Sequence, residues 1–174
     1  MVMKIKLINT ILSNIHGLKT KNYTSKVKKQ VAEYGENLSV NGPSVVTKST
    51  YLGNNVNFNG IHIQGQGEVR IGDNFHSGIE CMLITDIHNY EGEALPYDET
   101  VISKNITIED NVWLGNRVNI LPGVTIHEGA IIQLGSTVVK DVPKCAIVGG
   151  HPAQVFKYRD IDHYEKLKSL GKFH

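Results

Sequence analysis

Apolar residues recur at every sixth position through the second half of the chain. From residue 102, one column reads Ile102, Ile108, Leu114, Ile120, Ile126, Ile132 and Val138. A second column, four positions further on, is apolar or small and reads Ile106, Val112, Val118, Val124, Ala130, Ser136 and Val142. An amphipathic helix needs apolar spacings of three and four, and a hairpin sheet needs alternation with turns of its own. Neither fits this period, so the pattern predicts a series of short parallel strands.

Residues that tolerate left-handed backbone conformations stand directly before the second column. They are Asn105, Asn111, Arg117, Gly123, Gly129, Gly135 and Asp141. Each hexapeptide is therefore expected to form a short strand followed by a corner. Three such units would close one triangular coil, and coils would stack about 4.8 Å apart with both apolar columns inside. The predicted fold class is an all-β solenoid, a parallel β-helix.

The repeat is weaker upstream and is interrupted once. The same columns hold Leu52, Asn55 and Val56, then Ile71, Asn74 and Phe75, and the phase shifts by one residue between Asn57 and Val69. Between Ile87 and Ile102 the pattern stops, which predicts that a segment over about 87–101 leaves the coil. Long excursions from a rigid scaffold often contain functional residues.

Helical spacing replaces the hexapeptide period at both ends of the chain. Isoleucine or leucine at positions 5, 8, 12 and 15 predicts a short helix, and Ser25 is expected to cap a second one that ends near Gly35. Asp162 is expected to cap a third helix, which runs through Leu170 before Gly171. The predicted organisation is a helical segment over 1–38, the β-helix over 39–150, and a turn with a helix over 151–174.

Length and charge narrow the possible classes of protein. A chain of 174 residues, 40% of them hydrophobic, is enough for one core. Eighteen basic against seventeen acidic residues give a net charge near +1, which argues against nucleic acid or an anionic membrane as partner. Two cysteines exclude a disulfide scaffold, and polar residues interrupt the apolar run at Ile5–Ile15, so neither a secretory signal nor a membrane span is expected. The expected location is the cytoplasm.

Four motifs in order resemble those of the hexapeptide-repeat acyltransferases. They are Asp110–Gly115 (DNVWLG), Leu121–Ile126 (LPGVTI), Gly135–Pro143 (GSTVVKDVP) and Gly149–Ala153 (GGHPA). The similarity covers about residues 38–160 and is greatest to the maltose, galactoside and polysaccharide O-acetyltransferases. It implies a left-handed coil, although parallel crossovers are normally right-handed. It also implies acetyl-CoA as donor, no metal, a homotrimer, and active sites between neighbouring subunits.

His88 is the expected catalytic base. Acyl transfer to a hydroxyl needs a group that takes the hydroxyl proton, and histidine titrates closest to neutral pH. His88 lies where the repeat stops, at the place where the family has its catalytic histidine. Its orienting carboxylate is left open among Asp86, Glu91, Glu93, Asp98 and Glu99. The candidates for acceptor binding are Asn59, which resembles the family asparagine that faces the acceptor, with Tyr90 and Tyr97 from the excursion.

By motif position, the resemblance also assigns the coenzyme groove, including the C-terminal turn. The assigned residues are Trp113, Gly115, Asn116, Leu134, Ser136, Lys140, His151, Lys157 and Arg159. Lys140, Lys157 and Arg159 are the candidates for phosphate contacts, since coenzyme A presents phosphates to be matched by cations. Backbone amides are the family's oxyanion donors. The histidines assigned to surface or packing roles are His62, His76, His127, His163 and His174.

The function expected is direct transfer of acetyl from acetyl-CoA to a sugar or polysaccharide hydroxyl, within polysaccharide biosynthesis. Three alternatives stay open. An N-acyltransferase of an amino sugar or nucleotide sugar would use the same base and donor. A zinc-dependent enzyme like the carbonic anhydrases of this fold would need three histidine ligands, and here the candidates lie on different, irregular coils. A solenoid without activity would leave His88 and the Gly149–Ala153 motif unexplained.

Overall fold

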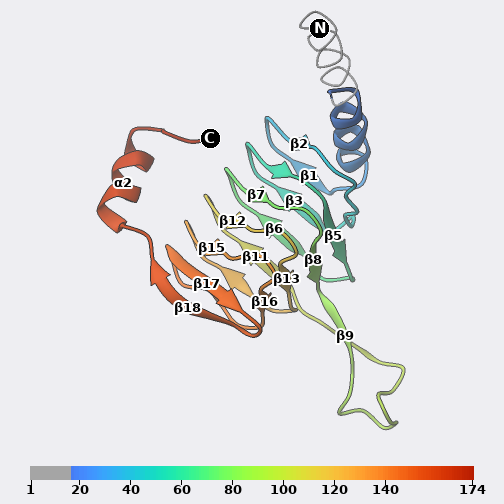
Figure 1. Cartoon of the computed structure of the whole chain (residues 1–174). Helices are drawn as coiled ribbons and strands as arrows, with labels where there is room; N and C mark the ends of the chain where they lie inside the picture. The colour runs from blue at the N-terminus through green and yellow to red at the C-terminus, as the bar shows by residue number, and fades with distance from the viewer. Residues whose placement is uncertain (1–16) are drawn as a thin grey trace, which may run out of the picture.

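The computed structural model describes residues 17–174, and in that part the chain winds into a left-handed parallel β-helix (Figure 1). One sheet contains β1 (Glu33–Tyr34), β3 (Thr50–Leu52), β6 (Val69–Ile71), β11 (Ile106–Ile108) and β14 (Thr125–Ile126). A second contains β2 (Ser39–Val40), β4 (Asn57–Phe58), β7 (His76–Ser77), β12 (Trp113–Leu114), β15 (Ile131–Ile132), β17 (Ala146–Gly150) and β18 (Ala153–Tyr158). The third contains β5 (Ile61–Gln64), β8 (Cys81–Ile84), β13 (Asn119–Ile120) and β16 (Thr137–Val138). The predicted solenoid is confirmed.

Both apolar columns line the interior, with one exception. The first column is buried from Ile108 to Val138, and every residue of the second is buried. Ile102 was expected inside, but it is only partly buried because it lies on the excursion, in β10 (Val101–Ser103). Burial of aliphatic side chains at about 1.5–3 kcal/mol each is the main stabilising contribution to a coil whose strands, apart from β17 and β18, are only two to four residues long.

The predicted left-handed corners are present except at two positions. Asn111, Arg117 and the three glycines between 123 and 135 have positive φ. Asn105 and Asp141 do not share that conformation, and their side chains accept hydrogen bonds instead. The carboxamide of Asn105 accepts from the amide of Glu68, and Asp141 accepts from the amide of Thr125. At these two positions the side chain bonds to a neighbouring coil, and the left-handed backbone conformation is not needed.

A ladder of asparagines runs along one edge of the coil. The Nδ2 of Asn55 donates to Oδ1 of Asn74 at 3.0 Å, and Nδ2 of Asn74 donates to Oδ1 of Asn111 at 3.0 Å. Asn111 then donates to the hydroxyl of Tyr164 at 2.9 Å, and that hydroxyl donates to Glu128 at 2.8 Å. The ladder therefore links the corners of successive coils to the C-terminal helix.

The two ends differ from the sequence expectation. Positions 5, 8, 12 and 15 lie outside the described residues. Residues 17–28 are helical, so the prediction that Ser25 caps a helix is wrong; that residue lies inside one. Sheet pairing already begins at Glu33, within the segment predicted as 1–38. In residues 17–174, no helix has the length and apolarity to cross a membrane.

The C-terminal helix α2 (Ile161–Ser169) is capped two residues before the predicted position. The side chain of Asp160, not Asp162, accepts from the amide of His163 and caps the first turn. Gly171 follows the helix with φ of 60°, as expected for a C-terminal glycine. The chain then runs back along the coil (Figure 1), where the His174 carbonyl accepts from Asn55 at 2.7 Å.

The predicted excursion is an antiparallel hairpin of β9 (Asp86–His88) and β10, with its loop over 89–100. It projects from the end of β8 (Figure 1), and the coil resumes at the same corner, where the Lys104 amide donates to the Thr85 carbonyl at 2.9 Å. The coil therefore continues in register across the excursion.

Candidate active site

His88 stands at the end of β9, exposed, and pairs with Val101 across the hairpin. The Tyr97 ring stacks on its imidazole, with 3.9 Å between centroids and 11° between planes. Tyr97 thus contacts the predicted base directly, whereas Tyr90 is 61% exposed in the same loop. Both nitrogens of His88 are left without a side-chain hydrogen bond among the described residues. The ring is presented outward on a short, paired strand.

Two carboxylates near His88 accept hydrogen bonds that hold the hairpin and its junction with the coil. Asp86 accepts from Ser103 at 2.7 Å, from Thr85 at 3.1 Å and from the Gln66 amide at 2.9 Å. Burial opposes ionisation there, but these hydrogen bonds outweigh it and hold the pKa of Asp86 below its usual value. Asp98 is held likewise, chiefly by the Thr100 hydroxyl and amide, which lower its pKa. Of the five candidates to orient His88, only Glu91, Glu93 and Glu99 are without such a role.

The outer face of the second sheet brings three side chains into one row. Asn57 pairs with His76, and His76 pairs with Trp113 on the next coil. The indole of Trp113 is 52% exposed. Asn59, beside this row, has its amide nitrogen 2.8 Å from the Ser77 carbonyl and 3.3 Å from Nε2 of His76. His76 therefore lies between Asn59, predicted to bind the acceptor, and Trp113, predicted to bind the coenzyme.

His76 was assigned to a surface or packing role. The sequence offered a signal, since His76 directly follows Phe75 of the second column as Trp113 follows Val112. An amide nitrogen only donates, so Nε2 of His76 accepts and the proton of the neutral ring is assigned to Nδ1. Burial, and then the nearby His174, lower the pKa of His76 below its usual value, which favours that neutral ring.

Several predicted coenzyme residues have roles in stacking the coils. A Cβ on Gly115 would lie 2.5 Å from the Leu134 amide, so the coils approach too closely there for a side chain. The carboxamide of Asn116 accepts from the Ile79 amide at 3.1 Å. Ser136 is buried, and its hydroxyl donates to the Gln133 carbonyl at 2.7 Å. A coenzyme groove at these positions would be lined by backbone.

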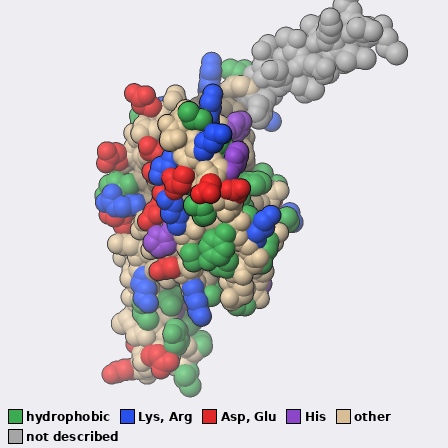
Figure 2. All heavy atoms as spheres, turned by 90° about the vertical axis from the view of Figure 1, so that its left-hand side faces the viewer, with side chains coloured by type: hydrophobic (Ala, Val, Ile, Leu, Met, Phe, Trp, Pro, Cys, Tyr) green, Lys and Arg blue, Asp and Glu red, His purple; other side chains and the backbone are tan. Residues whose placement is uncertain are grey.

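The remaining coenzyme candidates lie toward the C-terminal end of the coil. Leu134 is 74% exposed, and Lys140 and Lys157 are exposed. His151 Nδ1 lies 2.6 Å from the Thr137 hydroxyl. The Nε of Arg159 donates to the Gly129 carbonyl at 2.6 Å. Seen from the side of α2 and β18, apolar side chains lie among basic and acidic ones (Figure 2).

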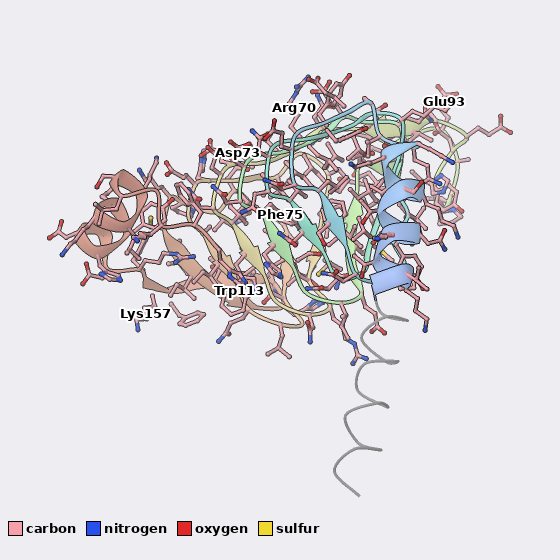
Figure 3. All side chains as sticks on the ribbon, turned by 90° about the horizontal axis from the view of Figure 1, so that it is seen from above. Arg70, Asp73, Phe75, Glu93, Trp113 and Lys157 are labelled. Carbon is pink, nitrogen blue, oxygen red and sulfur yellow. The ribbon has the colours of Figure 1, made fainter. Side chains whose placement is uncertain are left out.

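The loop of the hairpin and Trp113 lie on different sides of the coil. Glu93, in the loop beyond His88, and Trp113 are on opposite sides of the coil, whereas Lys157 lies on the same side as Trp113 (Figure 3). Between α2, the chain after it and the second sheet is a cavity of about 460 Å³, which includes His76 and Trp113 but not His88. Among residues 17–174, no group of three His, Cys, Asp or Glu side chains is placed to hold a metal ion.

Comparison with known proteins agrees with the coil and its motifs. The six-repeat model of the bacterial transferase hexapeptide family matches residues 105–140. Galactoside O-acetyltransferase of Escherichia coli K12 is 35% identical over 149 residues, covering 82% of this chain and 72% of that protein. A solved galactoside acetyltransferase in complex with coenzyme A superposes with a TM-score of 0.70 at 33% identity, over 80% of this chain and 71% of that one. A hexapeptide-repeat acetyltransferase of Vibrio cholerae with acetyl coenzyme A gives 0.64 at 26% identity, over 75% and 73%.

Proposed function

The chain belongs to the hexapeptide-repeat acetyltransferases related to galactoside O-acetyltransferase, and on that premise we propose that it transfers acetyl from acetyl-CoA to a hydroxyl of a sugar or polysaccharide. The supporting observation is the exposed imidazole of His88, held on a paired strand and stacked on Tyr97. A general base must reach the proton it removes. The His88 ring is oriented by Tyr97, and its nitrogens make no side-chain hydrogen bond among the described residues, so they are available to an acceptor hydroxyl. A cytoplasmic location and a place in polysaccharide biosynthesis belong to the same proposal.

In the proposed reaction, donor and acceptor are bound together and acetyl moves directly. His88 takes the proton of the acceptor hydroxyl as its oxygen attacks the thioester carbonyl, and the negative charge passes to the carbonyl oxygen. When the intermediate collapses, the carbon–sulfur bond breaks and the imidazolium returns the proton to the coenzyme A thiolate. Asn59 is the proposed acceptor contact, Trp113 and Leu134 line the donor groove, and Lys140, Lys157, Arg159 and His151 lie toward its phosphate end.

We assign the active site to the interface of a homotrimer. The separation of the hairpin from Trp113 supports this, because the base and the donor groove of one chain lie on opposite sides of its coil. In a closed trimer, the hairpin of one subunit reaches the second sheet of the next, and each of the three interfaces holds one site. One subunit then contributes Tyr97 and His88 to each site, and its neighbour contributes Asn59 and Trp113.

Subunit complementation tests this assignment. His88→Ala and Trp113→Ala chains are each expected to be inactive at limiting acetyl-CoA. In randomly mixed trimers, about a quarter of the interfaces would combine an intact His88 with an intact Trp113 from the neighbour. Mixing the two variants should therefore restore about a quarter of wild-type activity. Mixed trimers as inactive as either parent would place base and groove in one chain, and sedimentation of an active monomer would contradict the trimer.

A further inference from the structure

The carboxamide of Asn59, the proposed acceptor contact, is held by three neighbours in its own chain. Its nitrogen lies 2.8 Å from the Ser77 carbonyl oxygen and 3.3 Å from Nε2 of His76. Its oxygen accepts a hydrogen bond from Nδ2 of Asn41 at 3.1 Å. A carboxamide has two N–H donors and two lone pairs on its oxygen. Both donors of Asn59 are therefore engaged, and one lone pair of its oxygen is left for a ligand.

The Ser77 carbonyl determines which way round this carboxamide lies. A carbonyl oxygen only accepts hydrogen bonds, so the Asn59 atom 2.8 Å from it is assigned as the nitrogen. Turning the group over would place two oxygens against each other at that short distance. The oxygen of Asn59 therefore lies on the side of Asn41, and Asn59 is partly exposed.

Asn41 lies one complete coil before Asn59. Each of the two directly follows a short strand of the second sheet, and Val40 pairs in register with Phe58. They are 18 residues apart, which is three hexapeptides. The next position in this column is Gly78, which has no side chain to continue the row. The row of two asparagines therefore ends at Asn59, whose nitrogen bonds the main chain of the following coil instead.

Asn41 is itself held in the orientation that this contact requires. Its Oδ1 accepts from the hydroxyl of Ser39 at 3.3 Å and from that of Thr20, in the helical segment 17–28, at 3.4 Å. With the oxygen occupied on that side, the nitrogen faces Asn59. The hydrogen bonds thus run in one direction, from the N-terminal helix through Asn41 to the oxygen of Asn59.

This row is separate from the residues assigned to the coenzyme. Neither asparagine is among the described residues that line the cavity beside Trp113. Among residues 17–174, the side chain of Asn41 has hydrogen bonds to Thr20, Ser39 and Asn59. An effect of Asn41 on the reaction is therefore expected to pass through Asn59.

We propose that Asn41 is a positioning residue, which holds the Asn59 carboxamide so that its oxygen accepts a hydrogen bond from a hydroxyl of the sugar acceptor. The inference rests on the proposed function and adds a residue to its acceptor site. It also specifies the direction of the contact, because the engaged nitrogen of Asn59 leaves only its oxygen to meet the sugar.

Steady-state kinetics of the full chain test the positioning role, with methyl β-D-galactopyranoside and methyl α-D-glucopyranoside as acceptors. Asn59→Ala should raise the KM for the sugar about three- to tenfold, the effect of one neutral hydrogen bond. Asn41→Ala should raise it about two- to fivefold and leave kcat and the KM for acetyl-CoA unchanged. Asn41→Asp has the same size but cannot donate when ionised, so it should raise the KM for the sugar at least as much. Asn54→Ala is the matched control, since it removes a bond between coils, to Asp73, away from this row.

A double variant separates positioning from a merely structural role. In an Asn59→Ala background, Asn41→Ala should have no further effect on the KM for the sugar, because it acts through the residue that is already removed. A full further loss in that background would overturn the inference. So would a wild-type KM for the sugar in both Asn41 variants, or an equal rise in the KM for acetyl-CoA.

Nuclear magnetic resonance gives a readout that needs no turnover. The side-chain amide signals of Asn59, identified by their loss in Asn59→Ala, should shift in Asn41→Ala and stay in place in Asn54→Ala. Unshifted signals in Asn41→Ala would overturn the inference. Shifted signals without transfer to either sugar would overturn only the proposed function, whereas transfer with a KM for the sugar that does not respond to Asn41 would overturn only the positioning role.

Discussion

Removing the Tyr97 ring tests whether stacking positions the base. The ring lies 3.9 Å from the His88 imidazole between centroids, at 11° between planes, and Tyr97 is 45% exposed. Aromatic pairs contribute about 0.5–1.5 kcal/mol beyond their buried area. Because both rings are partly exposed, we expect the lower part of that range, about 0.5–1 kcal/mol. Tyr97→Ala should therefore lower kcat about two- to fivefold by reducing the population of correctly oriented imidazole.

The assay is release of coenzyme A thiol at saturating acetyl-CoA, with Tyr97→Phe as the matched variant. Phenylalanine keeps the stacked ring and should retain wild-type kcat, and neither variant should change the affinity for acetyl-CoA. In a His88→Ala background, Tyr97→Ala should have no further effect, because a positioning residue acts only through the base it positions. Wild-type kcat in Tyr97→Ala would refute the reasoning. An equal loss in Tyr97→Phe would mean that the hydroxyl contacts the acceptor instead.

Three further predictions concern the base, the excursion and the C-terminal helix. His88→Ala should lower turnover about 10²- to 10⁴-fold with an unchanged dissociation constant for acetyl-CoA, and near-normal turnover would remove His88 from the mechanism. The pKa of Asp86 is held below its ordinary 3.8, so its stabilisation is present above that value and is lost as the pH falls through the folded pKa. Asp86→Asn should therefore flatten the fall of Tm from pH 6 to pH 3, and an unchanged slope would contradict this. Tyr164→Phe removes bonds to Asn111 and Glu128 and should cost about 1–3 kcal/mol in urea unfolding; a loss below about 0.5 kcal/mol would show that the ladder does not fasten α2.

The coil was predictable because its core is periodic. Each turn places an aliphatic residue inside at fixed intervals, so the columns reveal the strands, the corners and the place of the hairpin. Ser136 was assigned to the coenzyme by its motif, but its position in the second column already placed it inside. Motif position alone does not distinguish a residue that touches ligand from one that stacks coils, as Gly115 and Asn116 illustrate.

The cavity and the stacked base were not predictable in this way. The contact of Asn55 with His174 joins residues 119 apart in sequence, and no period relates them. The stacking of Tyr97 on His88 depends on an irregular loop whose path is set by local hydrogen bonds of Asn89, Asp98 and Thr100. Contacts of these kinds arise from tertiary packing, which overrides any local pattern.

The hairpin leaves and rejoins the coil at one corner, so its loop can change in length without a change in the coil. Thr85 and Lys104 are bonded to each other whatever lies between them, so a longer or shorter loop leaves the neighbouring turns undisturbed. Doubling such a loop costs only about 0.6 kcal/mol in closure entropy. The hairpin that contains the proposed base is thus free to diversify by insertion and deletion, while the stacked turns proposed to bind the donor keep their geometry.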